Sequence, residues 1–371
     1  MSVNVKLGDV LEYEQPTKYI VDSINYDDTF PIPVLTAGKS FILGYTDESQ
    51  GIYEEIPVII FDDFTTAFHY VDFPFKVKSS AMKILKPVRE RADLKYLYYK
   101  MHTISVDTDL HKRYWISKYS QLQIPLPPLE TQQKIASILD AADTLRQKDK
   151  ALLAKYDELT QALFLDMFGD PVSNPKGWEI KTIEQVCSKI YGGGTPSKAH
   201  PEYYEGQIPW VTPKDMKSEY ISDSIDHVNQ SGVDNSSAKL IPENSVLMVI
   251  RSGILKHTLP VAINTKIVTI NQDMKAYIPN TNFTNSIYLK SFFQAVSSYL
   301  LSKVRAVTAD NIEFKQIKEL TFNCPPLLFQ TQFAERVVII EQQKALAQAS
   351  LEKSEELFNS LLQKAFKGEL N

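Results

Sequence analysis

The sequence has few of the residues from which disulfides and metal sites are built. Among 371 residues there are 2 cysteines and 6 histidines. Cys187 and Cys324 form no CxxC pair, and the histidines show no spacing such as HExxH. One disulfide is conceivable, but two buried free thiols are the favoured interpretation. The sequence therefore predicts no dedicated metal site.

Long apolar runs and an excess of one charge are also missing. No stretch approaches the roughly 18–20 apolar residues of a membrane span, and Met1–Lys6 lacks the apolar core of a signal peptide. We therefore expect a cytoplasmic protein. With 40 Lys and Arg against 45 Asp and Glu, the net charge is -5, which alone argues weakly against nucleic acid. The chain is 43% hydrophobic, enough to bury the cores of about two domains.

Two stretches predict long helices that pair with each other. The first follows Pro127-Pro128-Leu129 and ends at Gly169, a suitable left-handed cap, before Pro171. Apolar steps of three and four residues are typical of a helix–helix seam. The seam expected for this helix contains Ile135, Ile138, Ala142, Leu145, Asp149, Leu152, Tyr156, Leu159 and Leu163. The second helix starts near Phe329, and its expected stripe is Phe333, Val337, Ile340, Ala347, Leu351, Phe358, Leu361 and Ala365, with Lys344 and Ser354 as polar breaks.

These helices divide the chain into four parts. Residues 1–125 form a first block, 126–169 the central helix, 170–324 a second block and 325–371 the C-terminal helix. Both blocks combine short strand-like runs with helical patterns. The expected strands include Ile56–Phe61, Phe73–Val77, Ser245–Ile250 and Ile267–Ile270, and the expected helices are Leu94–His102 and Asn285–Leu301.

The chain is an internal repeat. Pro127-Pro128-Leu129 matches Pro325-Pro326-Leu327, and at the same offset Gln132 matches Gln330 and Phe168 matches Phe366. Within the blocks, at a slightly different offset, the matches are Met82-Lys83 with Met274-Lys275 and Tyr96-Leu97 with Tyr288-Leu289. Two similar blocks, each followed by a long helix, imply two similar tasks performed at a set distance from each other.

These motifs resemble those of the specificity subunits of Type I restriction-modification systems. The similarity lies in the two Pro-Pro-Leu-x-x-Gln helix starts, the helix endings around Phe168-Gly169 and Phe366-Lys367-Gly368, and Gly193-Gly194-Thr195-Pro196-Ser197. The chain departs from the family where a Glu often precedes the motif Gln, since Thr131 and Phe329 stand there. Phe333 also replaces the usual Ile.

The resemblance implies an α+β protein. It would have two similar mixed α/β target recognition domains joined by a pair of long antiparallel coiled-coil helices. Such a chain reads a bipartite, asymmetric site in double-stranded DNA. Its helices dock two modification subunits, which methylate adenine at N6 with S-adenosylmethionine, and restriction subunits can join. The chain itself would be non-catalytic and would bind no cofactor.

Three loops are candidates for DNA contact. Thr36-Ala37-Gly38-Lys39-Ser40 resembles the end of a P-loop, but Pro33 stands where the first Gly is needed. This leaves Lys39 and Ser40 in a DNA-contacting loop or in a plain turn. The loop with Gly193, Gly194, Thr195 and Ser197 either lets backbone N–H groups approach DNA or is an ordinary turn. Arg251-Ser252 follows a predicted strand. An arginine at this position either forms hydrogen bonds with a guanine in the major groove or is a surface residue without a role in DNA contact. Lys198 and Lys214 are weaker candidates.

Other functions fit less well. Asp62-Asp63 and Asp27-Asp28 could suggest a metal-dependent nuclease, but no third ligand follows, so solvated turns are expected. Asp72-Phe73-Pro74-Phe75 only approaches the motif by which amino-methyltransferases hold a flipped base. The alternative from another class is a structural coiled-coil adaptor whose two blocks bind proteins.

Overall fold

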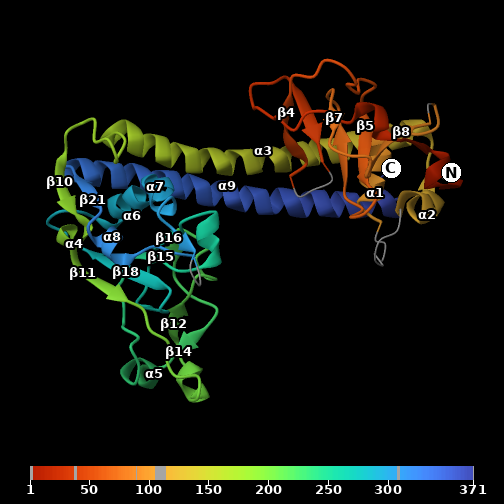
Figure 1. The fold of residues 1–371 in the computed structure, drawn as a ribbon. Coiled ribbons are helices and arrows are strands. Elements are labelled where there is room, and N and C mark those ends of the chain that lie inside the picture. Colours follow the sequence, from red (N-terminus) through yellow and green to blue (C-terminus); the bar gives the residue numbers. More distant parts are fainter. Residues whose placement is uncertain (1–2, 37–39, 89, 105–113, 307–309, 371) are drawn as a thin grey trace. The chain divides into compact units, whose positions relative to one another are not determined.

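The computed structural model describes residues 3–36, 40–88, 90–104, 114–306 and 310–370. The chain forms two compact units (Figure 1). Unit 1 comprises Met1–Ala151 with Gln348–Asn371, and unit 2 comprises Leu152–Ala347. The long helices α3 (Leu129–Phe168) and α9 (Leu327–Lys367) therefore contribute one segment each to both units.

Unit 1 is built on two sheets. A four-stranded sheet has the order β2-β8-β5-β6, and a three-stranded sheet has the order β4-β3-β7. Their strands are β2 (Leu11–Glu14), β8 (Met82–Pro87), β5 (Val58–Asp62), β6 (Phe68–Val71), β4 (Ile42–Thr46), β3 (Ile32–Leu35) and β7 (Lys76–Val77). A separate ribbon joins β1 (Val3–Lys6) to β9 (Gln123–Leu126). The helices are α1 (Leu94–Met101) and α2 (Tyr114–Ser117).

Unit 2 repeats this plan with additions. Its sheets have the orders β11-β18-β15-β16-β13 and β14-β12-β17. Their strands are β11 (Cys187–Gly192), β18 (Met274–Pro279), β15 (Val246–Val249), β16 (Val261–Asn264), β13 (Tyr220–Ile221), β14 (His227–Val228), β12 (Ile208–Val211) and β17 (Thr269–Ile270). Two ribbons pair β10 (Glu179–Thr182) with β21 (Thr321–Cys324) and β19 (Arg305–Ala306) with β20 (Asp310–Asn311). The helices are α4 (Ile183–Val186), α5 (Gln230–Asp234), α6 (Ser286–Ala295), α7 (Ser297–Leu301) and α8 (Phe314–Lys318).

The two units match strand for strand. The order β2-β8-β5-β6 of unit 1 recurs as β11-β18-β15-β16 in unit 2. The parallel pair β3–β7 recurs as the parallel pair β12–β17, and β13 is an additional strand of unit 2. The predicted fold class, with two similar mixed α/β units and paired long helices, is confirmed. The expected helix Asn285–Leu301 is instead two helices, because Val296 leaves the helical conformation between α6 and α7.

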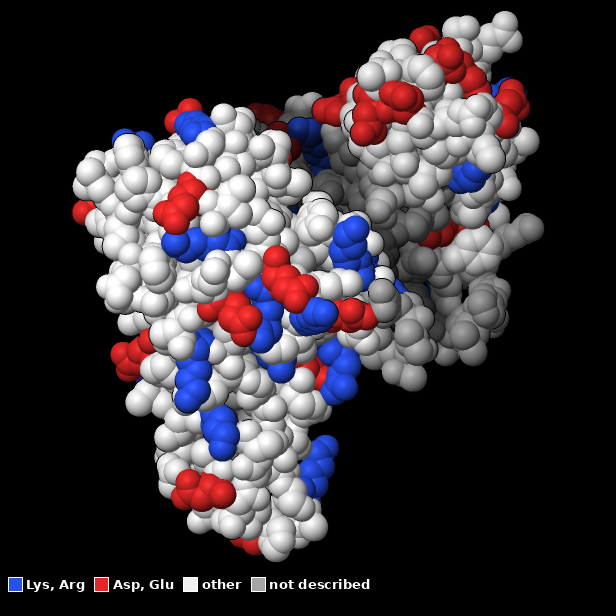
Figure 2. All heavy atoms as spheres, turned by 60° about the vertical axis from the view of Figure 1, so that its left-hand side comes forward, with Lys and Arg blue, Asp and Glu red and all other residues white. Residues whose placement is uncertain are grey.

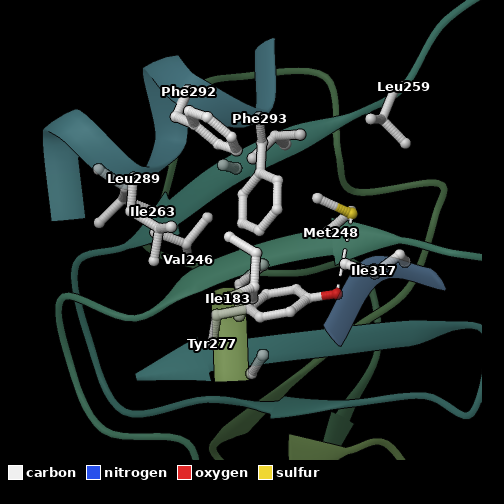
Figure 3. Packing of buried hydrophobic residues seen from close by; sticks show 14 of the residues in the cluster. Ile183, Val246, Met248, Leu259, Ile263, Tyr277, Leu289, Phe292, Phe293 and Ile317 are labelled. Carbon is white, nitrogen blue, oxygen red and sulfur yellow. Dashed lines mark hydrogen bonds between the residues drawn. The ribbon is translucent and has the colours of Figure 1, made fainter. Parts of the chain in front are cut away.

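The core of unit 2 forms where α6 lies on the larger sheet. Figure 3 shows Phe293 pointing from α6 toward strand residues that include Val246 and Tyr277. The rings of Phe293 and Tyr277 lie 5.0 Å apart, and both side chains are fully buried. The Tyr277 hydroxyl has the Met248 sulfur within 3.9 Å. Cys187 and Cys324 are free and buried, as predicted.

The motif glutamines tie each long helix to the short helix of its own unit. Gln132 is fully buried; its Oε1 accepts from Asp93 N at 2.9 Å, and its Nε2 donates to Pro127 O at 2.8 Å. Gln330 is also fully buried, and its Nε2 donates to Phe283 O and Pro325 O, both at 2.8 Å. Gln330 Oε1 accepts from Asn285 N at 3.4 Å. Asp93 and Asn285 are the N-caps of α1 and α6, so one glutamine fixes two helix starts in each unit.

Within each unit, α3 and α9 run antiparallel. In unit 2, Asp157 pairs with Lys344, and the rings of Phe164 and Phe333 lie 5.8 Å apart. In unit 1, Lys150 pairs with Glu355 at 3.0 Å, and Arg146 lies 4.3 Å above the ring of Phe358. In each unit, as the residue numbers increase along α3, those of the contact partners on α9 decrease. The two helices are therefore antiparallel there. Asp149 is buried, and both its carboxylate oxygens accept from Ser350 Oγ at 3.3 Å.

The predicted seam is right for α9 and partly wrong for α3. Phe333, Val337, Ile340 and Leu351 are buried, and Leu361 is half-buried. On α3, Ile135 is buried and Ile138 is half-buried. Leu145, Leu152 and Leu159, however, are 44%, 41% and 48% exposed, so they lie outside the seam.

The reason for this error is geometric. Ala142, Asp149 and Tyr156 lie in the seam under either of two assignments. A second set of seam positions can be placed three residues after them or four residues after them, and both spacings fit a heptad pattern. One series is Leu145, Leu152 and Leu159; the other is Leu139, Arg146, Leu153 and Thr160. The structure uses the second series, in which Leu139 is fully buried and Arg146 packs on Phe358.

Candidate nucleic-acid interface

The glycine-rich loop of unit 2 is shaped by close backbone contacts. A Cβ on Gly193 would lie 1.7 Å from Asn271 O, and one on Gly194 would lie 2.3 Å from Ala238 N. Gly194 N donates to Ile270 O at 2.9 Å, and its carbonyl accepts from Trp210 Nε1 at 3.0 Å. Packing within unit 2 therefore accounts for both glycines without any role in DNA contact.

The residues after these glycines lead to the surface. The Thr195 hydroxyl hydrogen-bonds Gln272 Oε1, so this loop is attached to the turn between β17 and β18. Ser197 and Lys198 are exposed. Lys214 is also exposed, and its backbone N–H donates to the Thr212 hydroxyl at 3.3 Å. Ser197 and Lys198 therefore remain available to a ligand.

Arg251 is held at the same turn by Asp273. Its Nε donates to Asp273 Oδ1 at 2.6 Å, and its side chain is 47% exposed. Its backbone forms an antiparallel bridge to Asn311. The Ser252 Oγ accepts weakly from Ile254 N at 3.4 Å and caps a short helical turn, Gly253–Lys256. The structure thus brings together two predicted segments, 193–197 and 251–252, around Gln272 and Asp273.

We call this group the β17–β18 loop cluster: residues 193–198, 251–252, 272–273 and 311. Figure 2 shows Lys and Arg spread over the visible face of unit 2, the lower body in that view, with Asp and Glu interspersed. The face is therefore of mixed charge, and the cluster itself combines Lys198 and Arg251 with Asp273. Arg251 already has a carboxylate partner, so it would have to exchange or share that partner to contact a base or phosphate.

Sequence reasoning missed Lys275, which lies on β18 beside the cluster. Its ammonium is 4.5 Å from the centre of the Phe314 ring, and burial lowers the pKa of this lysine. Its repeat counterpart, Lys83, is buried against Asp63 at 3.4 Å. The repeat match of Met82-Lys83 with Met274-Lys275 could have drawn attention to Lys275. It indicates that the two lysines are equivalent in the repeat, but it does not show that only Lys275 is half-exposed.

In unit 1, the candidate loop connects β3 to β4. These strands form an antiparallel pair, and Thr36 N donates to Phe41 O at 2.9 Å, so this is a hairpin connection. A P-loop joins a strand to a helix, which excludes that interpretation. Ser40 is exposed, whereas Lys39 lies outside the described residues. A role of this loop in DNA contact stays a prediction.

The expectation that Asp62 and Asp63 lie in a solvated turn is wrong. Their residues are only 4% and 3% exposed. Asp62 accepts from Phe64 N at 2.9 Å, and Asp63 accepts from Trp115 N at 2.8 Å. Both carboxylates satisfy backbone donors inside unit 1. No group of three or more candidate metal ligands occurs in the part of the chain that the structure describes.

The leucines excluded from the seam form an exposed row on α3. Leu145, Leu152 and Leu159 recur every seven residues, which places them along one side of the helix. At the matching positions of α9 stand Gln343, Ser350 and Leu357. The row is therefore a property of α3 that its repeat does not share. We call these three residues the α3 leucine row.

Comparisons with known proteins agree with this architecture. The family model for the Type I restriction modification DNA specificity domain matches residues 2–155 and 175–355. Over 305 residues, the chain is 45% identical to the specificity subunit of the Type I restriction enzyme EcoR124I/EcoR124II of Escherichia coli, covering 79% of this chain and 74% of that one.

Two solved structures share the fold. A Type I restriction-modification S subunit from M. genitalium aligns with a TM-score of 0.58 at 13% identity, over 99% of this chain and 96% of that one. A chain from a structure of complex assembly and conformational transition in the Type I R-M system aligns with a TM-score of 0.54 at 20% identity, over 100% and 98%.

The fold, the repeated helix motifs and the family model define a DNA specificity protein with two similar units. The chain belongs to the family of Type I restriction-modification specificity subunits, whose members recognise DNA and are not themselves catalytic. The helices in the described part of the chain include none that is long and apolar enough to cross a membrane.

Proposed function

We propose that the chain reads a bipartite, asymmetric site in double-stranded DNA, with one half recognised by each unit. The observation that carries this proposal is the strand-for-strand repeat of the two units. A repeated scaffold suits a repeated task. The two candidate surfaces differ, since unit 1 offers the β3–β4 connection and unit 2 the β17–β18 loop cluster. Different surfaces read different bases, so the two half-sites should differ.

In this proposal, the β17–β18 loop cluster contacts DNA through Lys198, Arg251 and Ser197, with Lys275 beside them. Thr195 and the two glycines shape the loop and hold it in place. Lys214, which is also exposed, would contact the DNA backbone. In unit 1, Lys39 and Ser40 would supply the corresponding contacts. Lysines contribute mainly to phosphate binding, while Arg251 can discriminate a guanine.

The paired helices would dock two modification subunits. These subunits hold S-adenosylmethionine and methylate adenine at N6, so this chain needs no cofactor of its own. Restriction subunits join the same assembly where the system has them, and the complex works in the cytoplasm, where the DNA is. The α3 leucine row supports docking because its three large apolar side chains are each more than 40% exposed.

The first test exchanges the second recognition block. Residues 170–324 are replaced by the matching block of another specificity subunit, and methylated adenines are mapped in cells that carry the modification subunit. One half of the methylated motif should change, and the other half should persist. A change in both halves, or in neither, would contradict the assignment of one half-site to each unit.

The second test places a charge in the α3 leucine row. Leu152→Asp should lower co-purification of the modification subunit by about tenfold, because it puts a carboxylate into an apolar contact. Leu152 is 41% exposed, so the chain alone should unfold at nearly the wild-type temperature. Ala154→Asp introduces the same charge on another side of α3 and is the matched control. Equal co-purification of both variants would count against docking at this row.

The coiled-coil adaptor is not favoured, since the family match covers both units. It would show no sequence-dependent affinity for DNA, whereas the proposed reader, assembled with its modification subunits, should bind its methylation motif more tightly than a scrambled duplex.

A further inference from the structure

A pocket of about 380 Å³ lies in unit 1 beside the end of α9. It is lined by Tyr96, Pro125, Pro127, Pro128, Thr131, Ile135, Ala365, Phe366, Lys367, Gly368 and Leu370. These residues come from α1, from the segment that runs from β9 into the start of α3, and from the last turn of α9 with the residues that follow it. We call this space the α9-end pocket. The residues that line this pocket belong neither to the α3 leucine row nor to the β17–β18 loop cluster.

The walls of this pocket recur in unit 2. The Tyr96 hydroxyl donates to Pro125 O at 2.8 Å, and the Tyr288 hydroxyl donates to Asn323 O at 2.8 Å. The ring of Tyr96 lies 5.4 Å from that of Phe366, and the ring of Tyr288 lies 4.7 Å from that of Phe168. Since these residues match at the repeat offsets, the two places are equivalent.

In unit 2, a tryptophan occupies this place. Trp178 Nε1 donates to Phe168 O at 2.9 Å, at the C-terminal end of α3. Its ring centre lies 5.8 Å from that of Phe329 and 6.5 Å from that of Phe168. Asn174 holds the segment in place, since its Oδ1 accepts from Trp178 N at 3.0 Å and its Nδ2 donates to Trp178 O at 2.9 Å. The indole ring of Trp178 is thus held by a hydrogen bond to the Phe168 carbonyl and by packing against the rings of Phe168 and Phe329.

The sequence of unit 1 has no tryptophan at the matching position. Val3 pairs with Leu126 as Glu179 pairs with Cys324, so Val3 matches Glu179, and the residue before Val3 in the sequence is serine rather than tryptophan. The other two tryptophans, Trp115 and Trp210, are buried elsewhere. Among the described residues, Gly368 N and Glu369 N donate to Ala365 O and Lys364 O, and no donor reaches Phe366 O. Phe366 O is the counterpart of the carbonyl that Trp178 satisfies.

We propose that the α9-end pocket binds a tryptophan side chain carried by an extended segment of a partner protein chain. The indole N–H donates to the Phe366 carbonyl, and the ring packs against Phe366 and Ile135. The partial negative charge at a helix C-terminus favours a donor there, and Trp combines a donor with a large apolar ring. Thr131, which stands where unit 2 has Phe329, leaves the rim open.

The peptide for the test comes from this chain itself. A synthetic peptide of residues 171–181, which contains Trp178, is titrated into the full-length chain by calorimetry. The same peptide with Trp178→Ala is the comparison. The tryptophan peptide should bind at least about tenfold more tightly. Equal affinity of the two peptides would overturn the proposal, and so would binding of free N-acetyltryptophanamide as tight as that of the peptide, since no extended segment would then be recognised.

A pocket variant locates the binding. Thr131→Arg fills the rim from a half-exposed position and should weaken peptide binding about tenfold. Gln133→Arg, an exposed neighbour that does not line the pocket, should bind as the wild type does. Equal binding by both variants would overturn the assignment.

A second measurement does not depend on any variant. The methyl resonances of Ile135 should shift with the tryptophan peptide and not with the alanine peptide. Unchanged Ile135 signals at saturating tryptophan peptide would place the binding elsewhere and would overturn the proposal.

Discussion

The two units share one backbone junction but differ in chemistry at five matched positions of it. In each, a short helix packs on the paired long helices: α1 in unit 1 and α6 in unit 2. The unit 1 positions Tyr98, Tyr99, His102, Arg146 and Phe358 correspond by the repeat offsets to Lys290, Ser291, Gln294, Lys344 and Thr160 of unit 2. At these five positions, unit 1 has mainly aromatic side chains and unit 2 has polar and charged ones.

In unit 1, the junction is packed with rings. The ring centres of Tyr99 and Phe358 lie 6.0 Å apart, and those of Tyr98 and His102 lie 4.8 Å apart. The Arg146 guanidinium stacks on Phe358 and bonds Asp143. Ring packing and a cation above an aromatic face both stabilise this junction.

In unit 2, an ion pair occupies the matched positions. Lys290 is fully buried and pairs with Glu219, which also accepts from Gln294 Nε2 at 3.0 Å. Burial alone would raise the pKa of Glu219, but the Lys290 charge and both hydrogen bonds outweigh it and hold the pKa below its ordinary value. A pocket of about 440 Å³ remains here, lined by residues that include Thr160 and Ser291.

The extra strand β13 accounts for this difference. Glu219 immediately precedes β13, and its carbonyl accepts from Ile263 N of β16 at 2.9 Å. Among the described residues of unit 1, no strand matches β13, and β6 is the edge strand of the sheet. A buried lysine at position 290 is tolerable only because this strand brings a carboxylate to it. A repeated backbone therefore does not ensure a repeated junction, since one added strand changes which side chains can be buried.

The largest effect is expected from Phe358→Ala in unit 1. Phe358 is 5% exposed, and its removal leaves a cavity and an unstacked Arg146. It should lower the free energy of unfolding by about 3–5 kcal/mol. Thr160→Ala, the matched change in unit 2, should cost less than about 1 kcal/mol because Thr160 is half-exposed. Urea denaturation measures both, and similar losses would break the contrast between the two junctions.

A somewhat smaller effect is expected from Lys290→Met in unit 2. It leaves Glu219 without its cation, and since that carboxylate is 31% exposed, the cost should be about 2–3 kcal/mol at neutral pH. Lys315→Met, at an 81% exposed side chain, is the control and should be nearly neutral.

The pH dependence of this effect identifies the ion pair. The pKa of Glu219 is depressed in the folded state, so its contribution is present above the ordinary Glu pKa and is lost as pH falls through the folded value. Without Lys290, burial raises the pKa of this carboxyl, so the stability difference between wild type and Lys290→Met should shrink as the pH falls through the acidic range in which Glu219 takes up its proton, first in the variant and then in the wild type. A difference that stays constant down to pH 3 would show that packing, rather than charge, explains the loss.

The smallest effects should be equal in the two units. Gln132→Ala and Gln330→Ala each remove a buried side chain that bonds backbone groups of its own unit. Each should cost about 1–3 kcal/mol in thermal or urea unfolding. A large cost in one unit alone would show that the two motif glutamines, despite matched contacts, are not equivalent.

Much of the fold could be predicted because its signals are local. Gly169 has a positive φ of 78°, as its predicted role as a helix cap requires. The seam of α9 is predicted correctly because its apolar residues fit one heptad series, which only Lys344 and Ser354 interrupt. The α3 leucines were misplaced because two side-chain series fit the same heptad spacing. Only contacts with α9 and the recognition block distinguish them.

The candidate site was less predictable. Segments 193–197 and 251–252 were each recognisable, but Gln272 and Asp273, which join them, carry no local signal. The two glycines looked like a ligand-binding feature and are explained by backbone contacts with Asn271 and Ala238. Whether a cation such as Lys83 or Lys275 is buried depends on a distant carboxylate, which periodicity does not reveal.

The sequence by itself determined the order of block and helix, the helix ends and the internal repeat, because caps, prolines and heptad spacing act over a few residues. Only the tertiary structure decided which leucines leave the helix seam, which lysines are buried, and that Trp178 has a counterpart pocket in unit 1. Each of these depends on contacts between different elements of the fold, such as the pairing of Lys290 on α6 with Glu219 before β13, 71 residues away in the chain. Such meetings are set by packing and charge compensation rather than by local preference.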